Sequence, residues 1–430
     1  MRYGFIFPTS TSDNYHMAKF NLIDINLKAI KIISGINFLS EISWPIEIER
    51  KFRESLQKNK KINLKFNYQN KDHSEKKNAL KNLLTHLSKD DPLHIYTYQT
   101  IDSYISMIDM VQNAGTPQFQ EISQKEYGVP KHLLFGSEYS HLNTAKHFLD
   151  VFHDYDHPYI QSEEPNLNAT DLKNFLEREA PTVLGEYTPK IEISKVIIAK
   201  VTAGRKRIRI RHDAKFSLVD LKNLLIHEVF THTLTSINGS LQEQLPLMAY
   251  GAPRTTKTQE GLATFSEVIT GLLDLDRLKR LSLRVLAIDM ALDGADLYDL
   301  NNFFHSNGQS AKESFNSAAR ILRGGFPKGG IVFTKDGVYL EGLIRVHSFF
   351  KWAFKKDHLD LIHLLFAGRM DVNDVFLLRE AYNKGQISHA EFLPDWYRNV
   401  NLLAGKMAFS FVANDISLKS VADYFEKKFV

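Results

Sequence analysis

Residues 190–212 carry the pattern that most constrains the fold. Their sequence, KIEISKVIIAKVTAGRKRIRIRH, alternates apolar and polar side chains on both sides of Ala203-Gly204, which predicts a β-hairpin. The surrounding segments show helical spacing instead, from residue 20 to 87, from 221 to 237 and from about 258 to 273. We therefore predict a mostly helical α+β fold, with a small β-hairpin or sheet beside the helix that follows it and a helical N-terminal region.

The composition excludes several classes of protein. The chain has no cysteine, so disulfides, thiolate nucleophiles and Cys-ligated metals are excluded, and any metal must be held by His, Asp or Glu. No apolar run reaches the roughly 18 residues of a membrane helix, and Pro8 interrupts the start before a signal-like region develops. The net charge of +4 is far from the concentrated positive charge of a nucleic-acid-binding protein. We expect a cytoplasmic protein with neither a membrane nor a nucleic acid as partner.

A polar segment at residues 113–131 marks the predicted domain boundary. Its sequence, NAGTPQFQEISQKEYGVPK, has little periodicity and carries Gly and Pro near both ends, which is typical of a connection between larger units. We predict an N-terminal helical region over residues 1–115 and a second domain over residues 116–430.

The sequence LLIHEVFTHTL places His227, Glu228 and His232 on the predicted helix 221–237. Two histidines with a Glu beside the first are typical of zinc peptidases, where the imidazoles hold the ion and the carboxylate is the general base. The usual spacing is four residues, whereas a spacing of five turns the rings roughly 140° apart on an ideal helix. If both bind one ion, a π-type widening, a tightened turn or a break must bring them together. The alternative is a surface helix with two unrelated histidines.

A third ligand is predicted 28 positions after His232, in TQEGLATFSEV. Glu260 is expected in the first turn of a helix, where many zinc peptidases supply a carboxylate, and Gly261 allows that helix a close approach. Glu267 is the alternative ligand, or else a partner for a histidine N–H. Without a metal, Glu260 would only complement the positive end of the helix dipole.

Other histidine pairs give weaker signals. His153 and His157 are four apart in HDYDHP, but Pro158 ends the helix there and no distant partner is evident. His358 and His363 are five apart without a Glu beside the first. We interpret the first pair as a polar helix end and the second as one exposed and one packed residue.

The predicted hairpin carries a stripe of positive charge just before the metal helix. Most such faces are merely solvated, but this one is placed to steer an acidic peptide, and it lacks the aromatic platforms of a nucleic-acid site. The stripe consists of Arg205, Lys206, Arg207, Arg209 and Arg211.

HEVFTH followed by QEGLA resembles the bacterial QEGLA-motif proteins and their animal relatives, the microtubule-associated tyrosine carboxypeptidases. The segments ISWPIEIERKF, KHLLFGSE, RILRGGFP and FTKDGVYLEG are similar as well. The resemblance implies a zincin-like catalytic domain over residues 116–430, Zn²⁺ bound by His227, His232 and Glu260, and Glu228 as the catalytic residue. One position departs from the family: an Arg commonly follows the second histidine by three residues, and here that residue is Thr235.

The reaction that the resemblance implies is removal of a C-terminal residue from a peptide or protein. Such a site needs a cation for the terminal carboxylate, and Arg binds carboxylates bidentately. The candidates are Arg320, Arg323 and Lys335, with Tyr339 as a candidate donor to the tetrahedral oxyanion. Ordinary surface charge around a Gly-Gly turn is the alternative for these residues.

The sequence leaves open which residue is removed, with an aromatic residue as one candidate, and leaves the oligomeric state open. Two other functions also stay open: a regulatory or binding protein that keeps the fold without turnover, and a zinc hydrolase of a non-peptide amide. The intact Glu228 argues against the first of these.

Overall fold

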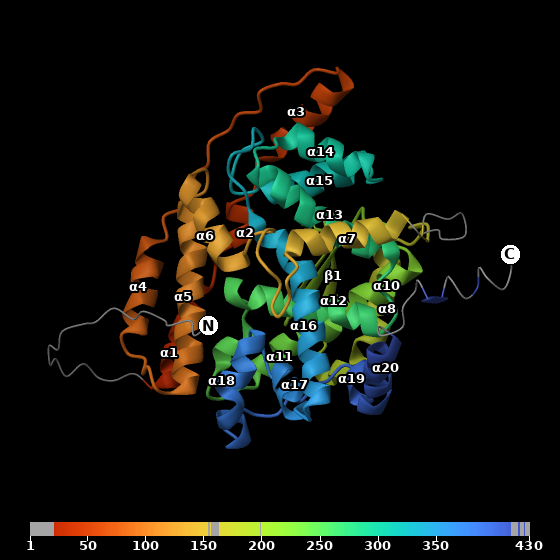
Figure 1. The fold of residues 1–430 in the computed structure, drawn as a ribbon. Coiled ribbons are helices and arrows are strands. Elements are labelled where there is room, and N and C mark those ends of the chain that lie inside the picture. Colours follow the sequence, from red (N-terminus) through yellow and green to blue (C-terminus); the bar gives the residue numbers. More distant parts are fainter. Residues whose placement is uncertain are drawn as a thin grey trace.

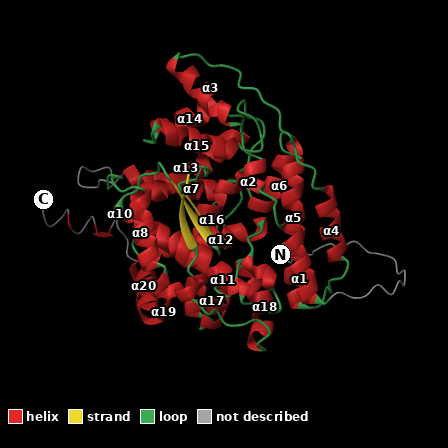
Figure 2. Ribbon diagram, turned by 180° about the vertical axis from the view of Figure 1, so that it is seen from behind, coloured by secondary structure: helices red, strands yellow, loops and turns green. Residues whose placement is uncertain are grey.

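A three-stranded sheet lies in the middle of a helical protein (Figure 2). The computed structural model describes residues 21–153, 155, 163–197, 199–413, 420–421 and 425. The strands are β1 (Lys190–Ser194), β2 (Val201–Gly204) and β3 (Arg207–Arg211), in the order β1-β3-β2. The predicted α+β class is confirmed.

The predicted hairpin corresponds to β2 and β3, which pair antiparallel from Val201↔Ile210 to Gly204↔Arg207. β1 adds to the other edge of β3 in parallel, with Ile191 opposite Ile208. One buried cluster contains Ile191 of β1, Val201 of β2 and Ile208 and Ile210 of β3, together with residues of the helix after the sheet. The sheet therefore packs against the helix that carries the histidine motif.

That helix is one continuous rod with a widened middle. It begins as α10 (Leu218–Leu224), whose N-terminus is closed by a capping box between Ser217 and Asp220, and ends as α11 (Leu234–Ser240). Between them lies η2 (Leu225–Thr233), a π-helix of nine residues. The predicted i→i+5 widening is confirmed, and it spans the whole histidine motif.

Helix α12 (Pro253–Ile269) crosses α16 (Val338–Lys355) at very short distance in the centre of the protein (Figure 1). A Cβ added at Gly261 would lie 2.3 Å from the carbonyl carbon and oxygen of Gly342. Only a residue without Cβ permits this contact, so the prediction that Gly261 allows close approach is confirmed. The helix begins at Pro253 rather than near residue 258, because Pro favours the first helical position.

The N-terminal helices α1 (Leu22–Ile33), α4 (Ser74–Leu84), α5 (Pro92–Gln112) and α6 (Pro117–Tyr127) stand together at one side, at the left in Figure 1. α6 occupies much of the polar segment 113–131. Its helical signals are local, since Pro117 starts it, Gly128 at φ 85° follows its end, and its buried face is only Phe119, Ser123 and Tyr127.

The remaining elements surround this centre. Figure 1 shows α3, α14 and α15 gathered at the top and α17 to α20 at the bottom. They are α2 (Phe38–Glu41), α3 (Ile46–Gln57), α7 (His141–His153), α8 (Ala169–Glu179), α9 (Pro181–Leu184), η1 (Gly185–Tyr187), η3 (Pro246–Ala249), α13 (Leu275–Leu292), α14 (Leu297–Ser306), α15 (Ala311–Leu322), η4 (Thr334–Gly337), α17 (Leu359–Leu365), α18 (Val372–Asn383), α19 (Asp395–Arg398) and α20 (Val400–Ala413).

Candidate metal centre

His227, His232 and Glu260 converge between η2 and α12. The Nε2 atoms of His227 and His232 lie 3.5 and 3.4 Å from Oε2 of Glu260. The two rings are edge to face, with centroids 4.9 Å apart. One donor atom from each residue lies within 4.8 Å of the other two, so a metal ion can be shared by all three.

Glu260 reaches this position from the middle of its helix. The prediction that it lies in the first turn is wrong, because α12 begins at Pro253 and Glu260 is its eighth residue. The preceding turns are buried through small hydroxyl residues, Thr255 and Thr258, which show no apolar periodicity in the sequence. The carboxylate is therefore presented from a helix held rigidly by α16, not from a helix end.

The second nitrogen of His227 is held by a buried ion pair. Nδ1 of His227 lies 2.6 Å from Oε1 of Glu267, whose side chain is fully buried. Arg277, at the start of α13, donates to both carboxylate oxygens of Glu267 at 3.2 Å. This chain fixes the ring so that Nε2 faces the other ligands, an arrangement typical of histidines that bind metals.

The electrostatics of the centre favour a cation. Burial by itself lowers the pKa of His227, but Glu260 and Glu267 raise it to about 10. Burial by itself raises the pKa of Glu260, but the two histidines and Lys335 hold it well below its usual range. Similarly, Arg277 and His227 overcome burial and lower the pKa of Glu267 to about 2. Both carboxylates are thus ionised at neutral pH, so they attract positive charge to this place.

Two imidazole nitrogens and one carboxylate oxygen form a donor set that suits zinc. Structural zinc sites close the ion with four protein ligands, whereas three ligands leave a position for water or substrate. Glu228 follows His227 directly and is half-buried, beside the ligands but not among them.

Thr235 is buried beside the motif. Its Oγ1 lies 2.7 Å from the carbonyl oxygen of Thr231 and 2.9 Å from Oε1 of Gln259, the residue before Glu260. The side chain at this position therefore connects the metal helix with α12 and carries no charge.

The four candidates downstream of the metal helices occupy different environments. Nζ of Lys335 lies 3.6 Å from Oε1 of Glu260, on the opposite side of the carboxylate from the histidines. It also lies 5.6 Å from the ring centroid of Tyr339. Arg320 binds Asp336 through two hydrogen bonds of 2.6 and 2.8 Å. Arg323 is half-buried at the end of α15, and burial lowers the pKa of its guanidinium.

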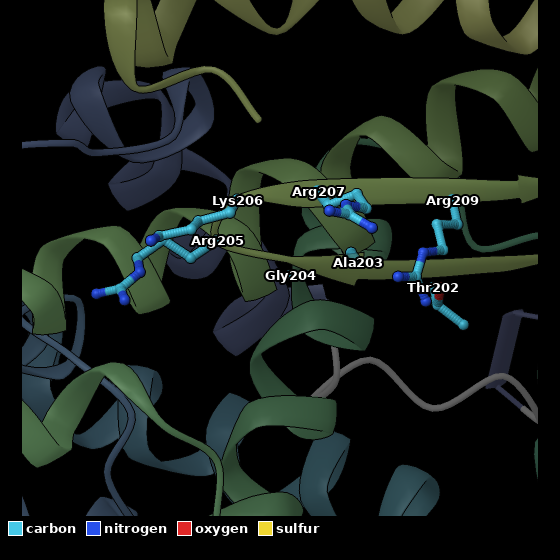
Figure 3. A pocket seen from close by; sticks show the side chains of 7 residues that line it. All are labelled: Thr202, Ala203, Gly204, Arg205, Lys206, Arg207 and Arg209. Atoms are coloured by element: carbon cyan, nitrogen blue, oxygen red, sulfur yellow. The ribbon is translucent and has the colours of Figure 1, made fainter. Parts of the chain in front are cut away.

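The basic stripe follows the hairpin of β2 and β3, where an open pocket is lined by Thr202, Ala203, Gly204, Arg205, Lys206, Arg207 and Arg209 (Figure 3). Part of this charge is neutralised locally. Nε of Arg207 lies 3.5 Å from Glu192, and Nε of Arg211 lies 2.6 Å from Asp213.

The two histidines of the pair His358 and His363 have partners away from the candidate metal centre. Nδ1 of His358 lies 3.3 Å from Arg379, whereas His363 packs its ring on Tyr397, with centroids 5.2 Å apart. His157 lies outside the described residues. Within the part of the chain that the structure describes, His227, His232 and Glu260 are the group able to hold a metal.

A family model described as microtubule-associated tyrosine carboxypeptidase matches residues 51–415. The chain belongs to this family. The match covers most of the chain and includes η2, α12 and η4, the elements that build the centre. Membership in the microtubule-associated tyrosine carboxypeptidase family implies an activity of the carboxypeptidase type. No curated protein matches the chain.

Several residues that shape the centre had no signal in the sequence. Arg277 lies 10 residues after Glu267 and Asp336 lies 16 residues after Arg320, inside the FTKDGVYLEG segment, whereas Arg369 is far along the chain from His232. Only their ion pairs and hydrogen bonds in space identify them.

Among the described parts of the chain, no helix combines the length and apolar character that crossing a bilayer requires.

Proposed function

We propose that this protein is a zinc metallocarboxypeptidase that removes the C-terminal residue of a peptide or protein. The observation that carries the proposal is the convergence of His227, His232 and Glu260 on one point, with Glu228 directly beside the first ligand. Family membership supplies the peptidase type of the reaction. The two nitrogen donors and the carboxylate support zinc over calcium or magnesium, which prefer oxygen ligands.

Zinc bound by these three residues would lower the pKa of a coordinated water and polarise the substrate carbonyl. Glu228, half-buried and next to His227 in the chain, would accept a proton from the attacking water and return it to the leaving amine. Glu267 and Arg277 hold His227 in the tautomer that presents Nε2. This leaves Glu228 as the acidic side chain of the motif that is free for proton transfer.

Lys335 is proposed to face the substrate. Burial lowers the pKa of Lys335, but Tyr339 and Glu260 raise it above its ordinary value, so the ammonium stays charged. A charged donor beside the metal ligands stabilises negative charge that develops on the substrate's carbonyl oxygen. Tyr339 is the candidate second donor, since its ring centroid lies 5.6 Å from Nζ of Lys335 and 5.0 Å from the guanidinium carbon of Arg284.

Arg320 is proposed to hold the segment η4, which carries Lys335, in place. Its guanidinium already binds Asp336 bidentately, and Asp336 neighbours Lys335 in η4. Arg323 stays an alternative contact for substrate, because none of the ion pairs found in the described residues involves it.

The test is the release of single amino acids from peptides by zinc-loaded protein. Peptides that differ only in a C-terminal tyrosine, phenylalanine, alanine or glutamate are incubated with the protein, and the products are identified by mass spectrometry. Glu228→Gln should keep the zinc and abolish release, because it spares the ligands and deletes the base. Glu243→Gln is the matched control, since Glu243 is exposed. Release at an undiminished rate by Glu228→Gln would contradict the assignment of the base, and internal cleavage would contradict the exopeptidase.

A further inference from the structure

Arg369 brings a guanidinium to the metal helix from a distant part of the chain. It lies between α17 and α18, which Figure 1 shows beside α11. Its backbone N–H donates to the carbonyl oxygen of Met248 at 2.8 Å, and its Nη2 donates to the carbonyl oxygen of His232 at 3.0 Å. Nη1 lies against Gly251, only 2.9 Å from where a Cβ would stand. The guanidinium therefore contacts the backbone of His232, one of the three candidate metal ligands.

The positive charge of Arg369 has no carboxylate at ion-pair distance among the described residues. Several other arginines of the interior are paired, as Arg254 is with Asp374, Arg277 with Glu267 and Arg345 with Asp371. Burial lowers the pKa of Arg369, and the phenol of Tyr104 and the carboxylates of Glu260 and Glu228 act on it electrostatically from farther away. A half-buried cation that lacks a counter-ion costs free energy, so its retention beside the ligands calls for an anion from outside.

A further donor near this guanidinium is also unused. The hydroxyl of Tyr104 is buried without a partner, as is Nε of Arg369 itself. Tyr104 packs in one cluster with Ala252 and Tyr250, the residues on both sides of Gly251, which contacts Arg369. Unsatisfied buried donors of this kind mark a place for an acceptor.

We propose that Arg369, with Tyr104, receives the terminal carboxylate of the peptide. A carboxylate has acceptors only, carries the missing negative charge and matches the fork of a guanidinium. In a carboxypeptidase it lies one residue, about 3.8 Å of chain, beyond the scissile bond. Its receptor must therefore adjoin the metal ligands, as Arg369 does. This inference rests on the proposed function and names the contact that makes the enzyme act at the chain end.

The variant Arg369→Gln removes the charge and is too short to reach the carbonyl oxygen of His232, whereas Arg369→Lys keeps the charge but loses the fork. The exposed Arg398 provides the control Arg398→Gln. Zinc content is measured for every variant, because loss of zinc would reveal a structural effect.

Binding is measured by calorimetry in the zinc-loaded Glu228→Gln background, which makes the readout independent of turnover. The probes are acetyl-Ala-Ala peptides ending in tyrosine, phenylalanine or glutamate, each as the free acid and as the C-terminal amide. The parent should prefer the acid, and Arg369→Gln should reduce that preference by about 10- to 100-fold, the range for hydrogen bonds to charged groups. Arg369→Lys should fall between them, and Arg398→Gln should match the parent.

The outcomes are separable from those of the proposed function. A preference for the acid that Arg369→Gln retains, or a parent without any such preference, overturns the proposal for Arg369. A preference that depends on Arg369 in a protein that releases no amino acid supports the carboxylate receptor and contradicts the peptidase instead.

Discussion

The contact between Gly261 and Gly342 leaves no room for a side chain beside the candidate metal centre. Adding a Cβ by Gly261→Ala places a carbon 2.3 Å from the carbonyl carbon and oxygen of Gly342 and 2.7 Å from its Cα. Carbon atoms in ordinary contact lie about 3.5 to 4.0 Å apart, so α12 and α16 must separate by roughly 1 Å. Both sides of this contact are backbone, and no side chain is able to rotate away.

We expect Gly261→Ala to lower the free energy of unfolding by about 3 kcal/mol, the upper part of the range for overpacked cores. The measurement is urea unfolding of the metal-free protein, followed by circular dichroism. Metal affinity should fall as well, since Glu260 precedes Gly261 and moves with it. Gly405→Ala in α20 is the control: its added Cβ meets nothing within 4 Å, so a helical Gly-to-Ala change there should stabilise by about 0.5–1 kcal/mol. Equal stability of Gly261→Ala and the wild type would refute the reasoning.

Three further predictions concern the metal and the ion pairs around it. Purified protein should contain about one zinc per chain by elemental analysis, and His227→Ala should lose it, because two protein ligands hold zinc poorly; stoichiometric zinc in the variant would remove His227 from the ligands. Glu267→Gln should weaken zinc binding by about 10- to 100-fold in chelator competition, the usual effect of deleting a partner of a ligating histidine, and unchanged affinity would show that His227 needs no support. The pKa of Asp336 is held far below its usual range, since Arg320 outweighs the effect of burial; its stabilisation is therefore full above the unfolded pKa of about 3.9 and is lost as the pH falls toward the folded value. The difference in unfolding free energy between wild type and Asp336→Asn should shrink on acidification below about pH 4, and a difference that grows there would contradict this sign.

The convergence of the candidate ligands was predictable in part because its constraint is local. His227 and His232 had to be brought to one side of a helix, and at five residues' spacing only a change of helical geometry does this. The π-helix over Leu225–Thr233 is that change. Glu260 was identifiable as a carboxylate on a second helix, although its place within the helix was wrong because the buried threonines before it have no apolar pattern.

The roles of the cations around the candidate metal centre were not predictable in the same way. Arg320 and Lys335 look alike in sequence, yet one is bound to Asp336 and the other lies beside Glu260. Which cation is neutralised depends on tertiary pairing between α15 and η4. The same holds for β1, whose alternation identified a strand but not its parallel partner, since pairing order is not a property of one segment.

The π-helix also determines which changes of length the motif tolerates. One residue deleted among residues 229–231 would leave the histidines four apart, and four residues turn a regular helix by about 400°, so both rings would still share a face. The segment would return to i→i+4 bonding while α11 kept its packing. One residue inserted there would turn one ring by a further 100° relative to the other. Because the segment is already a π-helix, a change to i→i+5 bonding could not compensate for this rotation. HEVFTH can thus be regarded as a motif with four-residue histidine spacing that has gained one residue. The nine residues of the π-helix accommodate this extra residue between the regular helices α10 and α11.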